Sequence, residues 1–334
     1  MMDSSPILIS SPRQNLIQPR DRREYRFQPI PERTAVAATD PDMLAESQRN
    51  RRALLVLLAG SIAIGGSPIF VRLSEVGPMV TAFWRVALAL LPLLIWMRFS
   101  PEPQAVARPQ TLLDRFYLAL PGFFLAADLA AWHLSLHITS VANATLLSNM
   151  APVFVTLASW LLFRTRVSGV FLAGLALAIT GVVILKGGPM ALGDGQVKGD
   201  LIAVVAAVFY AGYILSIGRL RSRFPTLTIM LWSTASATVC MAVVGLVTEG
   251  DFLPMTLFGW AMLAGLAFLT HAGGQGMIAY ALAFLPPAFS SLTLLLQPVV
   301  AALLAWLVLS EPVGAMQAVG GVIVLCGILL ARRG

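Results

Sequence analysis

The segment ANATLLSNMAPVFVTLASWLLFRTRVSGVFLAGLALAITGVVIL, residues 142–185, occurs a second time in related form at residues 288–331. Each copy predicts an apolar helix with an early proline, a short polar hinge and a second apolar helix. A repeat of this length exceeds the period of solenoid proteins, and it indicates a duplicated half-protein within a membrane. The offset of 146 residues (142 to 288) aligns Pro152 with Pro298, Trp160 with Trp306, Gly174 with Gly320 and Gly181 with Gly327.

Composition supports a lipid environment. Hydrophobic residues make up 57% of the chain and charged residues 12%, whereas a soluble domain carries about 25% charged residues. The mean hydropathy is +0.81. Long continuous apolar runs select membrane helices over β-strands, so we expect an all-α integral membrane protein.

The positions of the basic residues argue against a nucleic-acid partner despite the net charge of +7. Lys and Arg are concentrated in the first 52 residues and in alternate loops, which is the pattern that sets membrane orientation. Cys240 and Cys326 both lie in apolar segments, so neither a disulfide framework nor a metal site is expected.

After Arg52 the hydropathy pattern predicts ten membrane-spanning helices, each of about 19–28 residues. We divide the chain into a disordered basic tail (1–51), a first five-helix repeat (52–186), a connector (187–198) and a second five-helix repeat (199–334). The predicted spans are 53–71, 78–98, 115–137, 142–162, 167–185, 200–218, 225–247, 256–283, 287–309 and 313–331.

Loop charges predict the orientation. Alternate connections carry arginine, for example Arg98, Arg164 and Arg219, and this predicts that both termini lie in the cytoplasm. Because five helices per repeat is an odd number, the two repeats are then expected in opposite orientations. We expect a multi-pass protein of the inner (plasma) membrane.

The two stretches ATLLSNMAPVFVTLASWLLF…GLALAITGVVIL and SSLTLLLQPVVAALLAWLVLSEP…GGVIVLCGILL resemble the EamA repeats of the drug/metabolite transporter superfamily. The resemblance covers the chain after residue 52 and implies a ten-helix exporter with alternating access around a central cavity. It also implies export of amino acids, other metabolites or toxic organic compounds. One departure is that the acidic residue after the fourth helix is present as Glu311 but is replaced by Thr165 in the first repeat.

Ionisable residues within membrane helices are candidate functional groups, because they are costly to bury in lipid. At about 1.5 Å per residue, Arg85, Asp128 and Asn149 fall at similar depths in the outer half of the first repeat. An Arg85–Asp128 ion pair would lower the cost of both charges. The pair is equally consistent with a structural bridge and with a substrate site, where Arg85 would bind a carboxylate.

The second repeat adds polar residues near mid-membrane. His271 and Gln275 share a helix face, and Gln297 precedes Pro298. His271 is a candidate for proton coupling, with hydrogen bonding inside the bundle as the alternative. His133 and His137 are interpreted as interfacial residues. Trp84, Tyr210 and Tyr213 are candidates for an aromatic substrate wall, with helix packing as the alternative.

Four residues are candidate gating or hinge positions because proline bends helices: Ser67, Pro68, Pro152 and Pro298. Simple kinks without motion are the alternative. No nucleotide-binding loop is present, and no cofactor or metal is expected. We therefore predict a secondary transporter that exports small organic solutes, chiefly amino acids including aromatic ones, with protons as a candidate coupling partner. The alternatives are a multidrug, sugar or nucleoside exporter, or a membrane-embedded enzyme acting on lipid-linked substrates. Oligomeric state is left open.

Overall fold

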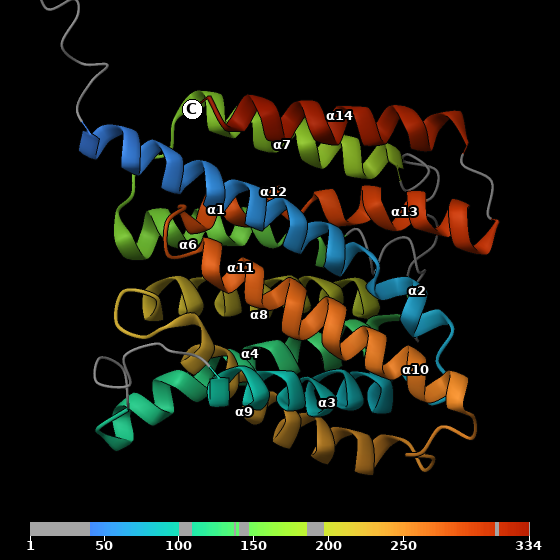
Figure 1. The fold of residues 1–334 in the computed structure, drawn as a ribbon. Coiled ribbons are helices and arrows are strands. Elements are labelled where there is room, and N and C mark those ends of the chain that lie inside the picture. Colours follow the sequence, from blue (N-terminus) through green and yellow to red (C-terminus); the bar gives the residue numbers. More distant parts are fainter. Residues whose placement is uncertain are drawn as a thin grey trace, which may run out of the picture. The chain divides into compact units, whose positions relative to one another are not determined.

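The structure is a computed structural model that describes residues 41–99, 109–136, 138–139, 147–185, 197–310 and 314–333 (Figure 1). The chain divides into two units, residues 1–44 and 45–334, and the second unit holds the helical fold. Most of the predicted tail lies outside the described residues. The first helix nevertheless begins at Pro41, inside the segment that was predicted to be disordered through residue 51, so that part of the prediction is wrong.

The described residues are all-helical, and they form ten successive helical stretches at the predicted places. Three of the ten are subdivided, by a break after Gly65, by a π-helical segment after Gly265 and by a break after Thr293. The helices are α1 Pro41–Gly65, α2 Ser67–Arg72, α3 Pro78–Phe99, α4 Leu112–Leu136, α6 Ala151–Phe163, α7 Gly169–Leu185, α8 Val197–Leu220, α9 Thr226–Thr248, α10 Leu257–Gly265, η2 Leu266–Gln275, α11 Gly276–Ala281, α12 Pro287–Thr293, α13 Leu296–Leu309 and α14 Ala315–Ala331.

Seven stretches within the described residues are long and apolar enough to cross a membrane. The other three, Ala151–Leu162, Gly169–Leu185 and Ala315–Ala331, are shorter apolar helices. Of these, α7 and α14 have 17 residues each, and at about 1.5 Å per residue this is close to the lower limit for a span. The predicted span 142–162 overlaps residues 140–146, which lie outside the described part.

Matching irregularities occur at matching positions of the repeat. Arg164, after α6, has φ 51°, and Ser310, after α13, has φ 54°; an offset of 146 residues (164 to 310) separates them. A left-handed residue closes a helix, and it is uncommon outside glycine. Pro152 and Pro298 stand in the first turn of α6 and α13, where the missing N–H of proline costs no helical hydrogen bond.

The last helices of the two repeats, α7 and α14, lie side by side and antiparallel (Figure 1). A Cβ atom added at Gly174 would lie 2.7 Å from the Gly327 carbonyl oxygen, and one at Gly181 would lie 2.9 Å from the Gly320 carbonyl oxygen. Glycine at these four positions therefore permits backbone contact between the helices. These are the four glycines that the repeat aligns.

Two glutamates cap helices across the repeats, and we call them the glutamate caps. Glu249, at the end of α9, accepts hydrogen bonds from the N–H groups of Met79 and Val80 in the first turn of α3, both at 2.9 Å. Glu75, in the loop before α3, accepts from the N–H groups of Met255 and Thr256, both at 3.0 Å, and from the Thr256 hydroxyl group. Free N–H groups at a helix start favour a carboxylate, so each loop is fastened to the other repeat.

Candidate functional site

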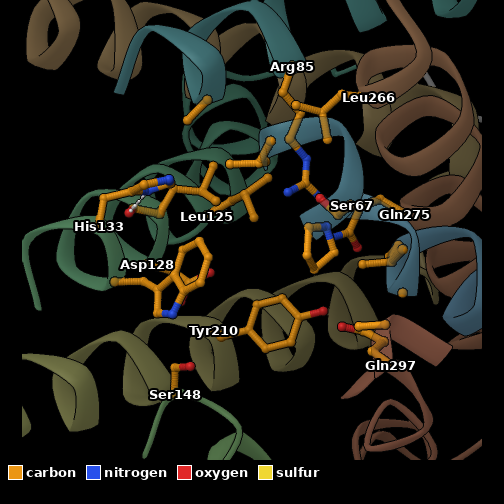
Figure 2. Close-up of a pocket in the computed structure, with 18 of the residues that line it drawn as sticks. Ser67, Arg85, Leu125, Asp128, His133, Ser148, Tyr210, Leu266, Gln275 and Gln297 are labelled. Atoms are coloured by element: carbon orange, nitrogen blue, oxygen red, sulfur yellow. Dashed lines mark hydrogen bonds between the residues drawn. The ribbon is translucent and has the colours of Figure 1, made fainter. Parts of the chain in front are cut away.

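A cavity of about 200 Å³ lies among seven helical segments, α1, α2, α3, α4, α8, η2 and α13, together with the residues just before α6. Figure 2 shows the side chains that line it. Both repeats contribute to the lining. The charged and strongly polar lining residues include Arg85, Asp128, His133, Tyr210, Gln275 and Gln297.

Arg85 on α3 and Asp128 on α4 both reach the cavity, and each side chain is half-buried. The ion pair expected between them is not formed, because no salt bridge joins these two described residues. The Nε of Arg85 is buried and has no hydrogen-bond partner within the described part of the chain. Equal depth in the membrane did not determine pairing, since the direction of each side chain depends on helix rotation. Two opposite charges therefore face one cavity without a salt bridge between these two described residues.

The second repeat contributes an amide wall. Gln275, at the end of η2, is 2% exposed and lines the cavity, and its Oε1 accepts a hydrogen bond from the Tyr213 hydroxyl group at 3.3 Å. Gln297, in the first turn of α13, has a buried Nε2 without a partner among the described residues. Tyr210 of α8 points its hydroxyl group toward Gln297 (Figure 2). This wall therefore brings two side-chain amides to the cavity, and Gln297 Nε2 has no acceptor among the described residues.

The η2 segment is π-helical over Leu266–Gln275, and such segments are rare and frequently occur at functional sites. Its two ends, Leu266 and Gln275, both line the cavity. His271 lies between them, is 1% exposed and is not among the lining residues; its Nε2 lies 3.0 Å from the Thr234 hydroxyl group. The sequence alternative of hydrogen bonding inside the bundle therefore matches its position.

Six of the nine predicted binding residues line the cavity, and three do not. Those on the lining are Arg85, Asp128, Asn149, Tyr210, Gln275 and Gln297. Besides His271, Tyr213 lies behind the wall at 1% exposure. Trp84 turns away from the cavity, donates from Nε1 to the Phe252 carbonyl oxygen at 2.6 Å and packs edge-on against Trp260.

Three of the four predicted hinge residues line the cavity: Ser67, Pro68 and Pro298. They stand where α1 gives way to α2 and where α13 begins. Pro152 occupies the first turn of α6 and is not part of the lining. The helix breaks thus border the cavity on the α1/α2 and α13 sides.

The polar lining residues that sequence reasoning missed include Thr81, His133 and Ser148. His133 is 3% exposed, its Nδ1 lies 2.7 Å from the Leu129 carbonyl oxygen, and its ring packs against Trp132. The position of His133 could have been predicted from the helix face that carries Asp128. Leu125, Leu129 and Trp132 share that face at intervals of three and four residues. His137 lies outside the described residues.

No group of three or more His, Cys, Asp or Glu side chains is placed to hold a metal ion in the described part of the chain. The fold and the cavity define a multi-pass helical membrane protein with a polar chamber inside it. The chain belongs to the EamA-like transporter family, whose pattern matches it twice, at residues 51–186 and 197–333. Its members are transporters, and the protein is not an enzyme. The family resemblance seen in the sequence is thereby confirmed.

Similar proteins agree with this assignment. An uncharacterised transporter of Archaeoglobus fulgidus is 27% identical, over 84% of this chain and 97% of its own length. A probable terminal-alkyne amino-acid exporter of Streptantibioticus cattleyicolor is 27% identical, over 84% of this chain and 92% of its own. The pseudopaline exporter CntI of Pseudomonas aeruginosa is 25% identical, over 75% and 84%. A crystal structure with 16% identity superimposes with a TM-score of 0.72, covering 84% of this chain and 97% of that one, which shows a shared fold.

Proposed function

We propose that this protein is a secondary transporter that exports small organic solutes, chiefly amino acids including aromatic ones, by alternating access. One observation carries the proposal: in a transporter-family chain, Arg85 and Asp128 line one cavity that both repeats enclose, and no salt bridge joins these two described residues. Charges that are costly in a membrane persist where they serve a solute.

We further propose that residues 52–186 and 199–334 act as two inverted halves, which rock about the cavity. The antiparallel contact of α7 and α14 supports this, because Gly174 faces Gly327 while Gly181 faces Gly320. The offset of the repeat converts the first pair into the second. A two-fold relation between oppositely oriented halves produces such reciprocal contacts.

The distribution of basic residues supports cytoplasmic termini in the inner membrane. This orientation is tested by placing single cysteines at Ser222, exposed before α9, and at Asp251, exposed after α9, in a background where Cys240 and Cys326 are serine. An impermeant thiol reagent added to intact cells should label position 251 and spare position 222. The opposite result would reverse the orientation.

The cavity favours a metabolite over a drug-sized molecule. Its volume of about 200 Å³ is below the roughly 300–1,000 Å³ of pockets that hold drug-sized ligands. Trp132 and Tyr210 supply aromatic surface to the cavity. Apolar surface comes from Leu125, Leu129 and Leu266. Two of the similar proteins are named as exporters, one as a probable terminal-alkyne amino-acid exporter and one as a pseudopaline exporter. The first name supports amino-acid-like solutes.

The test is efflux from proteoliposomes that contain the purified full chain and a labelled mixture of amino acids. Selective efflux of some components, absent from protein-free liposomes, is the expected result. A response to an imposed pH gradient would establish proton coupling, and its absence would leave the solute gradient as the energy source. If no amino acid leaves the liposomes, the proposed substrate class is wrong, and labelled sugars, nucleosides and organic cations are tested in the same assay.

A further inference from the structure

We infer that the cavity holds its solute in one fixed orientation, with a carboxylate group against Arg85 and the amides of Gln275 and Gln297, and an ammonium group against Asp128. This inference rests on the proposed function and adds the chemistry by which the solute is recognised. It makes the substrate class zwitterionic, with an apolar or aromatic side chain.

The end of the cavity that contains Arg85, Gln275 and Gln297 has more hydrogen-bond donors than acceptors. A guanidinium group donates up to five hydrogen bonds and accepts none, yet Arg85 Nε is buried without a partner among the described residues. Gln297 Nε2 is buried without a partner in the same part of the chain. Donors without acceptors are costly in a low-dielectric site. A carboxylate supplies two oxygen atoms with about four acceptor positions, and it matches a guanidinium group in a bidentate manner.

Tyr213 sets the polarity of Gln275 and is a positioning residue in this scheme. An amide can present either its oxygen or its nitrogen to a ligand. The Tyr213 hydroxyl group donates to Gln275 Oε1 at 3.3 Å from behind the wall, so the oxygen is engaged and the NH₂ group is what the amide can offer to a solute. Tyr213 itself is 1% exposed and does not line the cavity. Its effect on the solute therefore passes through Gln275.

The opposite end is anionic. Asp128 lies on α4 with His133, and in Figure 2 these two residues stand on one side of the cavity while Gln275 and Gln297 stand on the other. Asp128 forms no salt bridge with Arg85, although both belong to the described residues. An ammonium group is the complement that a carboxylate outside any salt bridge attracts. Leu125, Leu129 and Trp132, on the face of α4 that carries Asp128, give the side chain of the solute an apolar surface.

The inference is tested by calorimetric binding to the purified full-length protein, which does not require that a variant still transports. The probes are phenylalanine, N-acetylphenylalanine (carboxylate only) and phenylalaninamide (ammonium only). Arg85→Gln should weaken phenylalanine and N-acetylphenylalanine at least about tenfold, as expected for a lost charge-assisted contact, and leave phenylalaninamide unchanged. Asp128→Asn should weaken the binding of phenylalanine and phenylalaninamide and leave the binding of N-acetylphenylalanine unchanged.

Tyr213→Phe provides a readout that a merely structural role would not move. It should weaken the two carboxylate-bearing probes about two- to tenfold and spare phenylalaninamide. The matched controls are Tyr117→Phe, Arg115→Gln and Asp251→Asn, at exposed positions, and each should bind all probes as the unaltered protein does. Arg85→Lys, which retains the charge but loses the planar fork, should fall between Arg85→Gln and the unaltered protein.

The outcomes separate the two claims. If phenylalanine binds and leaves liposomes, but each variant weakens all three probes equally, the fixed orientation is overturned and the proposed function stands. The same holds if Tyr213→Phe affects phenylalaninamide as much as N-acetylphenylalanine. If the unaltered protein neither binds phenylalanine nor releases any amino acid from liposomes, the proposed substrate class falls, and the inference falls with it.

Discussion

The glutamate caps and the cavity both contain charged side chains, but the fold binds those of the caps and leaves those of the cavity, among the described residues, without a salt bridge to each other. In the caps, the carboxylates of Glu75 and Glu249 each accept at least two hydrogen bonds from N–H groups in the first turn of a helix, or just before it, in the other repeat. In the cavity, Asp128 and Arg85 lie among membrane helices, and no salt bridge joins these two described residues. One pair of acids is fully engaged by the fold, and the other charges are left open to the cavity.

A glycine lies next to the carboxylate of each glutamate cap. A Cβ atom at Gly77 or at Gly259 would collide with the carboxylate of Glu249 or of Glu75, respectively. The backbone at both places is thus shaped around a carboxylate that is already bound. For Arg85 and Asp128, the described residues offer no such mutual complement. The difference teaches that engaged acids stabilise this fold, whereas the open charges are available to a solute.

The largest expected effect comes from the cavity charges. Arg85→Gln or Asp128→Asn should reduce efflux of the best amino-acid substrate at least about tenfold, because each removes a charge-assisted contact. Neither should lower the thermal unfolding temperature, since no ion pair between them is broken. Efflux and thermal unfolding are measured on the same preparations. A loss of about 3–5 kcal/mol in unfolding free energy, typical of breaking a buried ion pair, would instead show that these charges are structural.

The sequence predicted well where each helix lies along the chain, and poorly which face of a helix borders the cavity. Apolar run length and charge placement predicted the ten helical stretches, and the repeat predicted the matching prolines and the glycines of α7 and α14. Depth along the helices also placed Arg85, Asp128, Asn149, Gln275 and Gln297 at levels that do border the cavity. These features depend on one-dimensional spacing, which a sequence displays.

The rotation of each helix about its axis, and contacts between residues far apart in the chain, could not be predicted from such spacing. Trp84 was assigned to the site with Arg85, but successive residues of a helix point about 100° apart, so one faces the cavity and the other faces Trp260. The glutamate caps join residues about 170–180 positions apart, and neither short loop displays the partner that it needs. The π-helical turns of η2 have no pattern of their own in the sequence.

A smaller effect is expected at the engaged acids. Glu249→Ala should lower the free energy of unfolding by about 1–2 kcal/mol, because the N–H groups of Met79 and Val80 lose their cap. Gly77→Ala should act in the same direction by displacing the carboxylate. Amino-acid efflux, measured per folded molecule, should stay close to that of the unaltered protein, with Asp251→Asn as the control. Efflux that falls tenfold at unchanged stability would give the caps a part in transport and remove the contrast with the cavity.

The caps should also respond to acid. Hydrogen bonds from the hydroxyl and N–H groups of Thr256, and from the Met255 N–H group, lower the pKa of Glu75 below its ordinary value of 4.5. A lowered pKa in the folded state contributes stability that is complete above the ordinary value and is lost as the pH falls through the lowered one. The difference in unfolding temperature between the unaltered protein and Glu75→Gln should therefore be constant near neutral pH and shrink below pH 4.5. A difference that grows with acid would reverse the assigned sign.

The smallest effect is expected where an engaged acid has an exposed partner. Asp114, at the start of α4, accepts hydrogen bonds from the N–H groups of Gln110 and Thr111 and from Arg223, whose side chain is 62% exposed, at 3.1 Å. Water screens such a pair, and its loss usually has little effect on stability. Arg223→Gln should therefore leave both thermal unfolding and efflux unchanged, although this contact, like the glutamate caps, joins the two repeats. If Arg223→Gln destabilised the protein as much as Glu249→Ala, engagement by helix N–H groups would not be what distinguishes the caps, and contact between the repeats would be the better explanation.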